Sequence, residues 1–181
     1  MQDKLRKILK HYGEEAQSKK YIEKLSRLMI AIIKGDIKNI IEEIADVKVM
    51  TKQFLAFDNI DLQEYEDCGI WIDFISSDTP DRAVEQKLKL EMVDILRGLV
   101  LNKRNCLIEF ICGMEYYLDR YMDINNISKE EIEKEMERKI NRQLERIERE
   151  KEVKSIKEEC PCMKEESYNC GMKCSRCGRE L

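Results

Sequence analysis

Hydrophobic residues recur along most of this chain at intervals of three and four positions, which is the period of one face of an α-helix. The polar residues between them fall on the opposite face, as expected of amphipathic helices packed around a core. This pattern predicts helices over residues 2–12, 15–34, 37–56, 62–68, 70–76, 81–101, 104–122 and 129–157. The sequence therefore predicts an all-α protein.

Polar residues mark the starts of two of these helices. Pro80, with Thr79 as its cap, is expected to begin one, because proline is favoured in the first helical turn. Ser128 is expected to cap the last helix, with Glu131 three residues on at the spacing of a capping box. That helix carries one long apolar stripe: Ile132, Met136, Ile140, Leu144 and Ile147.

Two long segments of the chain resemble each other. Residues 17–66 align with residues 84–133 at a constant offset of 67, without a gap. Any two amphipathic helices share an apolar period, so the matching apolar residues are weak evidence of a repeat. The stronger evidence is the gapless register and the similarity of the loops "DNIDLQEYE" and "NNISKEEIE". We interpret them as a tandem duplication that forms two helical hairpins in a pseudo-symmetric bundle.

The predicted domains follow from this duplication. The first helical unit is expected over residues 1–69, the second, with the long last helix, over residues 70–158, and a tail over residues 159–181. Trp71, in "GIWIDF", is expected to pack in the core or between the units.

Composition and charge narrow the class of protein. Charged residues make up 39% of the 181 residues, and 2 prolines and 7 glycines leave room for long helices. The net charge of −4 gives no general attraction to nucleic acid or to an anionic membrane. No apolar run approaches the roughly 20 residues that span a bilayer, and the N-terminus lacks an apolar signal core. A cytoplasmic protein without membrane contact is expected.

The segment "NIIEEIADVKVM", residues 39–50, places carboxylates on an apolar helix. On a helical wheel Glu43 falls within the apolar stripe, Asp46 lies at its edge, and Glu42 points outward. Burying a lone carboxylate is costly, so Glu43 requires a cation, a proton or a metal ion nearby.

These residues carry a family resemblance. "EEIADV" (42–47), the preceding "YIEKLSRLMIAIIKGDIKN" and the later "ISKEEIEKEMERKINRQLERI" (127–147) resemble the MazG-like, all-α nucleoside triphosphate pyrophosphohydrolases. The superfamily includes dimeric dUTPases with a tandem arrangement, and its pattern is E-E-x-x-E on one helix and E-x-x-D on the next. The resemblance implies that such acids hold Mg²⁺, which binds a nucleoside triphosphate and activates water, releasing the monophosphate and pyrophosphate.

The first copy departs from that pattern in one half. Glu43 and Asp46 are present, but Lys24 and Arg27 stand where the preceding helix of the family carries acids.

The second copy departs in the other half. It keeps Glu91 and Asp94, whereas Phe110 and Gly113 replace the acids of the following helix. Glu109 survives there and matches Glu42 of the first copy. Each position lost in one copy therefore corresponds to a position kept in the other.

Two accounts of this pattern remain open. In the first, the retained halves of the two copies face each other and form one composite Mg²⁺ site. The ligands of the ion would be Glu43, Asp46, Glu91 and Asp94. Glu42 or Glu109 would orient the attacking water. In the second, Lys24 and Arg27 neutralise the acids of the first copy, and the site is inactive. The first predicts a Mg²⁺-dependent nucleoside triphosphate pyrophosphohydrolase. The second predicts an inactive scaffold or a nucleotide-sensing or partner-binding protein, and a homodimer is compatible with both.

Three basic residues of the last helix resemble the family's basic positions, and they are the candidate phosphate ligands: Lys139, Arg142 and Arg146. Ordinary surface charge is the alternative for each of them.

The last 22 residues contain five of the eight cysteines. Cys174 and Cys177, followed by glycine, have the spacing of a zinc knuckle, and Cys160 and Cys162 supply a second pair, with Cys170 as a rival ligand. Four thiolates favour a structural Zn²⁺ with no open coordination position, and so short a segment folds only with the metal. Such a zinc ribbon commonly contacts a protein or a nucleic acid.

Overall fold

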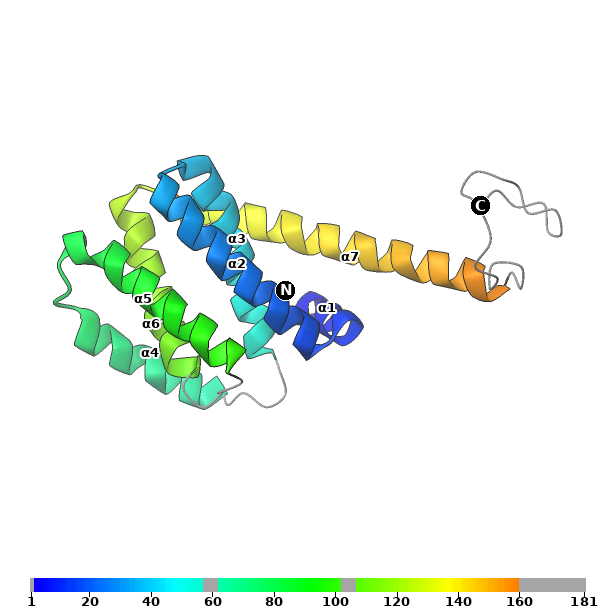
Figure 1. Ribbon diagram of the computed structural model, residues 1–181, viewed down its shortest axis with the longest axis horizontal. Helices are drawn as coiled ribbons and strands as arrows, with labels where there is room; N and C mark the ends of the chain where they lie inside the picture. The colour runs from blue at the N-terminus through cyan, green and yellow to red at the C-terminus, as the bar shows by residue number, and fades with distance from the viewer. Residues whose placement is uncertain (1, 57–61, 102–106, 160–181) are drawn as a thin grey trace. The chain divides into compact units, whose positions relative to one another are not determined.

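The computed structural model describes residues 2–56, 62–101 and 107–159, and all regular structure in these ranges is helical (Figure 1). This confirms the all-α class. Two compact units are distinguished, Met1–Ile140 and Asn141–Leu181. The helices are α1 (Gln2–Tyr12), α2 (Glu14–Lys34), α3 (Ile37–Leu55), α4 (Leu62–Ser76), α5 (Asp81–Val100), α6 (Leu107–Ile124) and α7 (Lys129–Glu159).

Two helical hairpins form the larger unit. α2 packs along α3, and α5 packs along α6, while α2 and α5 also contact each other. α4 lies on α6, and α1 contacts α2 and α3. The first part of α7 belongs to this unit and buries Ile132, Met136 and Ile140.

The two hairpins bury the same positions at the offset of 67. The residues that face the core of α2 and α3 recur on α5 and α6 as Tyr21 and Leu88, Leu25 and Met92, Leu28 and Ile95, Ile40 and Leu107, Ile44 and Ile111, Val47 and Met114, and Phe54 and Tyr121. Both hairpins therefore present the same register of side chains to the interior, as their hydrophobic periods require.

A two-residue turn reverses the chain between α2 and α3. Gly35 takes the left-handed conformation, with φ of 69°, and its N–H donates to the carbonyl oxygens of Ala31 and Ile32. This is the usual helix end for glycine, which has no Cβ to clash there. The Asp36 side chain then accepts a hydrogen bond from the N–H of Asn39 and caps α3.

The cap predicted for α7 is confirmed, and the one predicted for α5 is not. The Ser128 hydroxyl accepts a hydrogen bond from the N–H of Glu131 at 3.3 Å. Pro80 itself is the cap residue of α5, and no side chain caps that helix. The Thr79 hydroxyl instead lies 3.3 Å from that of Tyr117.

α4 corrects the expectation of two short helices at residues 62–68 and 70–76. One continuous helix passes through Gly69, so the predicted domain boundary at 69/70 falls inside an element. Gly69 does not interrupt the helix. Glycine makes a break easier because it lacks a Cβ atom, but it also adopts helical backbone angles. Trp71, expected to pack in the core or between the units, is 59% exposed.

An ion pair links the two hairpins. Lys48 of α3 donates to Asp119 of α6 at 2.8 Å, and Lys129 of α7 lies 3.4 Å from the other carboxylate oxygen. Burial opposes ionisation of Asp119, but the hydrogen bond and the charge of Lys48 outweigh it, and the pKa of Asp119 is lowered.

The described part of the second unit, up to Glu159, is helical and highly charged. Arg146 pairs with Glu150 and Lys151 with Glu148, as expected for residues one helical turn apart. The predicted zinc ribbon lies outside the described residues. No described helix has the length and apolar character needed to cross a bilayer.

We expect the equivalent core positions of the two hairpins to contribute similarly to stability. Leu25→Ala and Met92→Ala should each lower the free energy of unfolding by about 3 kcal/mol, because each leaves a cavity. Ile33→Ala and Val100→Ala, at exposed positions, should change it by less than about 0.5 kcal/mol. Urea unfolding followed by circular dichroism measures all four. Equal losses at exposed and buried positions would contradict the observed register.

Candidate functional site

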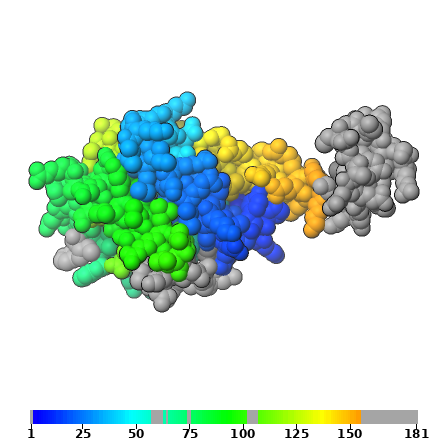
Figure 2. Space-filling view, viewed as in Figure 1, coloured from blue at the N-terminus to red at the C-terminus, as the bar shows by residue number. Residues whose placement is uncertain are grey.

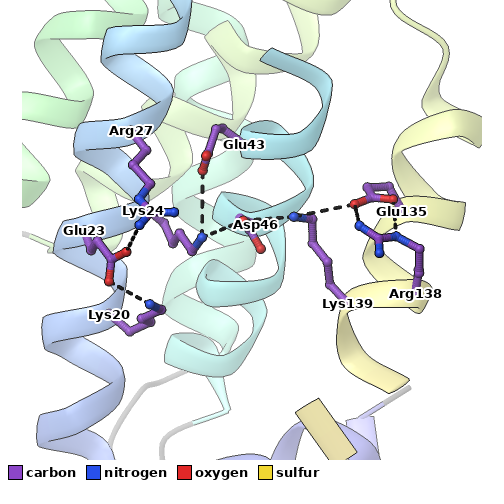
Figure 3. Close-up of polar contacts among 9 residues, drawn as sticks. All are labelled: Lys20, Glu23, Lys24, Arg27, Glu43, Asp46, Glu135, Arg138 and Lys139. Atoms are coloured by element: carbon purple, nitrogen blue, oxygen red, sulfur yellow. Dashed lines mark hydrogen bonds and ion pairs between the residues drawn. The ribbon is translucent and has the colours of Figure 1, made fainter. Parts of the chain in front are cut away.

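The two retained acids of the first hairpin face a lysine. Glu43 and Asp46 lie on α3 with side chains 12% and 13% exposed, and Lys24 approaches them from α2. Its Nζ atom donates to Oδ2 of Asp46 at 2.7 Å and lies 3.9 Å from Oε2 of Glu43 (Figure 3). The buried-acid expectation is therefore met by an ammonium group.

A second lysine reaches the same carboxylate from α7. Nζ of Lys139 lies 2.9 Å from Oδ2 of Asp46 and 3.5 Å from Oε1 of Glu135 (Figure 3). Lys139 is only 5% exposed. Two ammonium groups thus converge on one oxygen, and the residue expected to bind phosphate is engaged by the protein itself.

Arg27 does not contact the acid pair. Its guanidinium binds Glu23 one turn earlier on α2 at 2.6 Å, and Glu23 also accepts from Lys20 at 2.7 Å (Figure 3). Arg27 acts on Glu43 only through its charge, which opposes the rise in the pKa of that carboxyl. Of the two cations expected to neutralise the acids, Lys24 does so by contact.

Glu43 is the poorly satisfied member of the cluster. Among the described residues, its buried Oε2 atom has no hydrogen-bond partner. Burial raises the pKa of Glu43, and the charges of Lys24, Arg27 and Lys139 oppose that rise. The network therefore brings two ammonium groups to Asp46 and leaves the Oε2 atom of Glu43 without a hydrogen bond.

In the second hairpin, Glu91 of α5 faces Gly113 of α6. A Cβ atom at position 113 would lie 2.7 Å from Cδ of Glu91 and 2.9 Å from its Oε2 atom. At the offset of 67 these residues correspond to Lys24 and Asp46, so the same pair of positions meets in both hairpins. Here the carboxylate occupies the space that a side chain at position 113 would need.

Neighbouring acids and burial both raise the pKa of Glu91. Its pKa is raised to about 7, mainly by burial, with further contributions from the charges of Asp94 and Glu109, while Lys87 opposes the shift. Asp94 is half-buried and Glu109 is exposed. Glu42, the counterpart of Glu109, is also exposed, and its charge helps to raise the pKa of Arg138.

The structure does not assemble the four predicted Mg²⁺ ligands. Within residues 2–56, 62–101 and 107–159, no group of three or more His, Cys, Asp and Glu side chains is placed to hold a metal ion. Glu43 and Asp46 have lysines as neighbours, whereas Glu91 interacts with Asp94 and Glu109. The acids of each hairpin therefore remain with that hairpin.

The other candidate ligands are placed as follows. Arg142 and Arg146 are exposed in the second unit, and Arg146 donates to Glu150 at 2.8 Å. The candidate zinc ligands lie outside the described residues: Cys160, Cys162, Cys170, Cys174 and Cys177. Sequence reasoning missed the role of Lys139 at Asp46, because the two residues are far apart along the chain and share no local pattern.

Comparisons of the chain with protein-family models, with curated proteins and with solved structures give no match. The residues themselves must therefore indicate the chemistry. In the first hairpin they form an internally neutralised acid pair, and in the second a small group of interacting carboxyl groups.

Removing the central lysine should destabilise the protein. Lys24→Met should lower the free energy of unfolding by about 3 kcal/mol, because it leaves two largely buried carboxylates with fewer positive charges. Lys20→Met, one turn away on the same helix and in an exposed ion pair, should cost less than about 1 kcal/mol. Urea unfolding at pH 7 measures both. Equal losses in the two variants would show that burial of the contact between Lys24 and Asp46 does not increase its contribution to the free energy of unfolding.

Glu91 should make stability depend on pH. Its pKa is raised from 4.5 to about 7, so its contribution is fully present below pH 4.5 and is lost as the pH rises through 7. Between pH 5 and 8 the native protein should lose about 1 kcal/mol more than Glu91→Gln, after allowance for solvent screening. Glu85→Gln, exposed on the same helix, should keep the native profile. Thermal unfolding across this pH range measures the difference, and parallel profiles for native protein and Glu91→Gln would contradict it.

Proposed function

We propose that this chain is a non-catalytic binding protein built on a MazG-like tandem helical bundle, in which lysine ammonium groups replace the divalent cation. The observation that carries the proposal is the pair of contacts from Lys24 and Lys139 to one oxygen of Asp46, at 2.7 and 2.9 Å. Together they supply the two positive charges that a Mg²⁺ ion would bring to this carboxylate.

An ammonium group neutralises an acid without providing metal chemistry. It donates hydrogen bonds, but it has no coordination position for a phosphate oxygen and does not generate a bound hydroxide as a metal ion does. A metal ion at Asp46 would have to displace Lys24 and Lys139 from largely buried positions, and each displaced charge would need a new partner. The first hairpin is therefore better suited to holding its helices together than to hydrolysis.

The finer architecture belongs to the same proposal. The common register of buried residues at the offset of 67 supports descent of both hairpins from one ancestral unit. The cysteines that follow α7 along the chain would bind one structural Zn²⁺, through four of Cys160, Cys162, Cys170, Cys174 and Cys177. A ribbon of this kind would recognise a protein or nucleic-acid partner, for which the bundle serves as the scaffold.

A second candidate function is Mg²⁺-dependent hydrolysis of a nucleoside triphosphate to its monophosphate and pyrophosphate. Glu91 favours it, because a carboxyl pKa that is raised by burial and by the charges of neighbouring acids occurs more often at functional sites than elsewhere. This candidate would place the metal near Glu91, away from Lys24, with triphosphate and water oxygens as further ligands, because no three acids of the described residues are placed to hold it by themselves.

Two measurements separate the candidates. Native protein incubated with a panel of nucleoside triphosphates and Mg²⁺ should release no pyrophosphate above the blank. Lys24→Glu/Arg27→Glu restores E-E-x-x-E on α2 opposite Glu43 and Asp46. This variant should be stabilised by 10 mM Mg²⁺, by about 3 °C or more in its melting temperature, while the native protein is not.

The control is Lys20→Glu, which adds an acid to the same helix outside the pattern and should gain no Mg²⁺ response. Pyrophosphate release by native protein that disappears in Glu91→Gln would overturn the non-catalytic proposal in favour of hydrolysis. A double variant that folds without responding to Mg²⁺ would remove the support for a MazG-like site.

A further inference from the structure

α5 carries apolar side chains on both of its faces. One face, with Val84, Leu88, Met92 and Ile95, is buried in the bundle. The opposite face exposes a second apolar stripe, in which each side chain is between 45% and 69% exposed: Leu90, Val93, Val100 and Leu101. Their spacing places them on one side of the helix. Figure 2 shows the residues of α5, in green, at the surface of the molecule.

The hairpin fold does not require this stripe. At the offset of 67, Leu90, Val93 and Leu101 correspond to Glu23, Ser26 and Lys34 of the first hairpin, while Val100 corresponds to Ile33, which is also exposed. Glu23 forms ion pairs with Lys20 and Arg27 on the solvent side of its helix. The same architecture therefore accepts polar or charged residues at three of the four positions where α5 exposes aliphatic side chains. Exposed aliphatic side chains gathered on one side of a helix indicate an interaction surface.

The charges along the stripe identify its partner. Arg97 lies exposed between Val93 and Val100, and it has no ion pair among the described residues. Asp94, half-buried, borders the stripe on its other side. Along the helix the residues follow the order apolar, acidic, basic, apolar. When a second copy of the helix runs in the opposite direction, its basic residue faces the acidic residue of the first copy, and its apolar residues face apolar residues.

We propose that this stripe is the interface with a second copy of the chain, whose α5 packs antiparallel to the first about a two-fold axis near position 95. Leu90 then lies opposite the partner's Val100, and Arg97 lies beside the partner's Asp94. Both contacts occur twice, as a two-fold interface requires.

The opposite helix direction is excluded by charge. A parallel pairing in register would place Arg97 beside the partner's Arg97 and Asp94 beside the partner's Asp94, and like charges across an interface are costly. A single stripe of this length is smaller than the interface of an obligate dimer, so the association is weak and depends on concentration. It is independent of whether the bundle hydrolyses nucleotides.

Sedimentation equilibrium of the full chain between about 5 and 500 µM tests the proposal. Native protein should fit a monomer–dimer equilibrium, and Val93→Asp and Val100→Asp should each raise its dissociation constant at least 30-fold, because each inserts a charge into the apolar contact. The matched control is Ile70→Asp, at a 72% exposed position on α4, which should leave the dissociation constant unchanged. Circular dichroism confirms that each variant is folded.

A charge exchange tests the direction of pairing. Asp94→Arg and Arg97→Asp should each weaken association about 10-fold, and the double variant should recover to within about 3-fold of the native value. A native protein that stays monomeric at 500 µM overturns the proposal, as does an equal loss of association in Ile70→Asp. Failure of the double variant to recover overturns the antiparallel pairing.

Discussion

The bridge from Lys24 through Asp46 to Lys139 is the interaction on which the larger unit depends. It joins α2, α3 and the first part of α7 at one carboxylate oxygen, in a place that is nearly closed to water. None of the three charges would be stable there alone, because each would lose its hydration without compensation. The cluster therefore holds the three helices together. Its main effect is that separating the helices would leave buried charges without a partner, rather than a large net attraction between the charges.

The two hairpins treat one pair of positions in opposite ways. In the first, Lys24 faces Asp46 and the charges cancel. In the second, Glu91 faces Gly113, so the acid is accommodated by the lack of a side chain across from it. One solution is electrostatic and the other is steric, and both let the surrounding aliphatic residues keep the same packing. A shared scaffold thus supports two different local environments for an ionisable group.

Local patterns made most of the fold predictable, since helix periods and the Ser128 cap are properties of neighbouring residues. The helical wheel placed Glu43 in the apolar stripe, and the family resemblance pointed to Lys24 as a neutralising cation in one of the two open accounts. Lys139 was not, because its approach to Asp46 depends on how α7 packs. Arg27 finds a nearer acid on its own helix, which competes with the long-range pair. The interruption predicted at Gly69, between helices 62–68 and 70–76, is absent because glycine makes a helix break easier without requiring it.

The contact between Glu91 and Gly113 constrains how this protein can evolve. A side chain at position 113 would need the space that the end of the Glu91 side chain now occupies, so the flexible Glu91 side chain would have to take another rotamer. A substitution at either position therefore changes the space available to the side chain at the other. If the residue at position 113 were an acid, the two carboxyl groups would also repel each other, so the residue that fits at one position depends on the residue at the other.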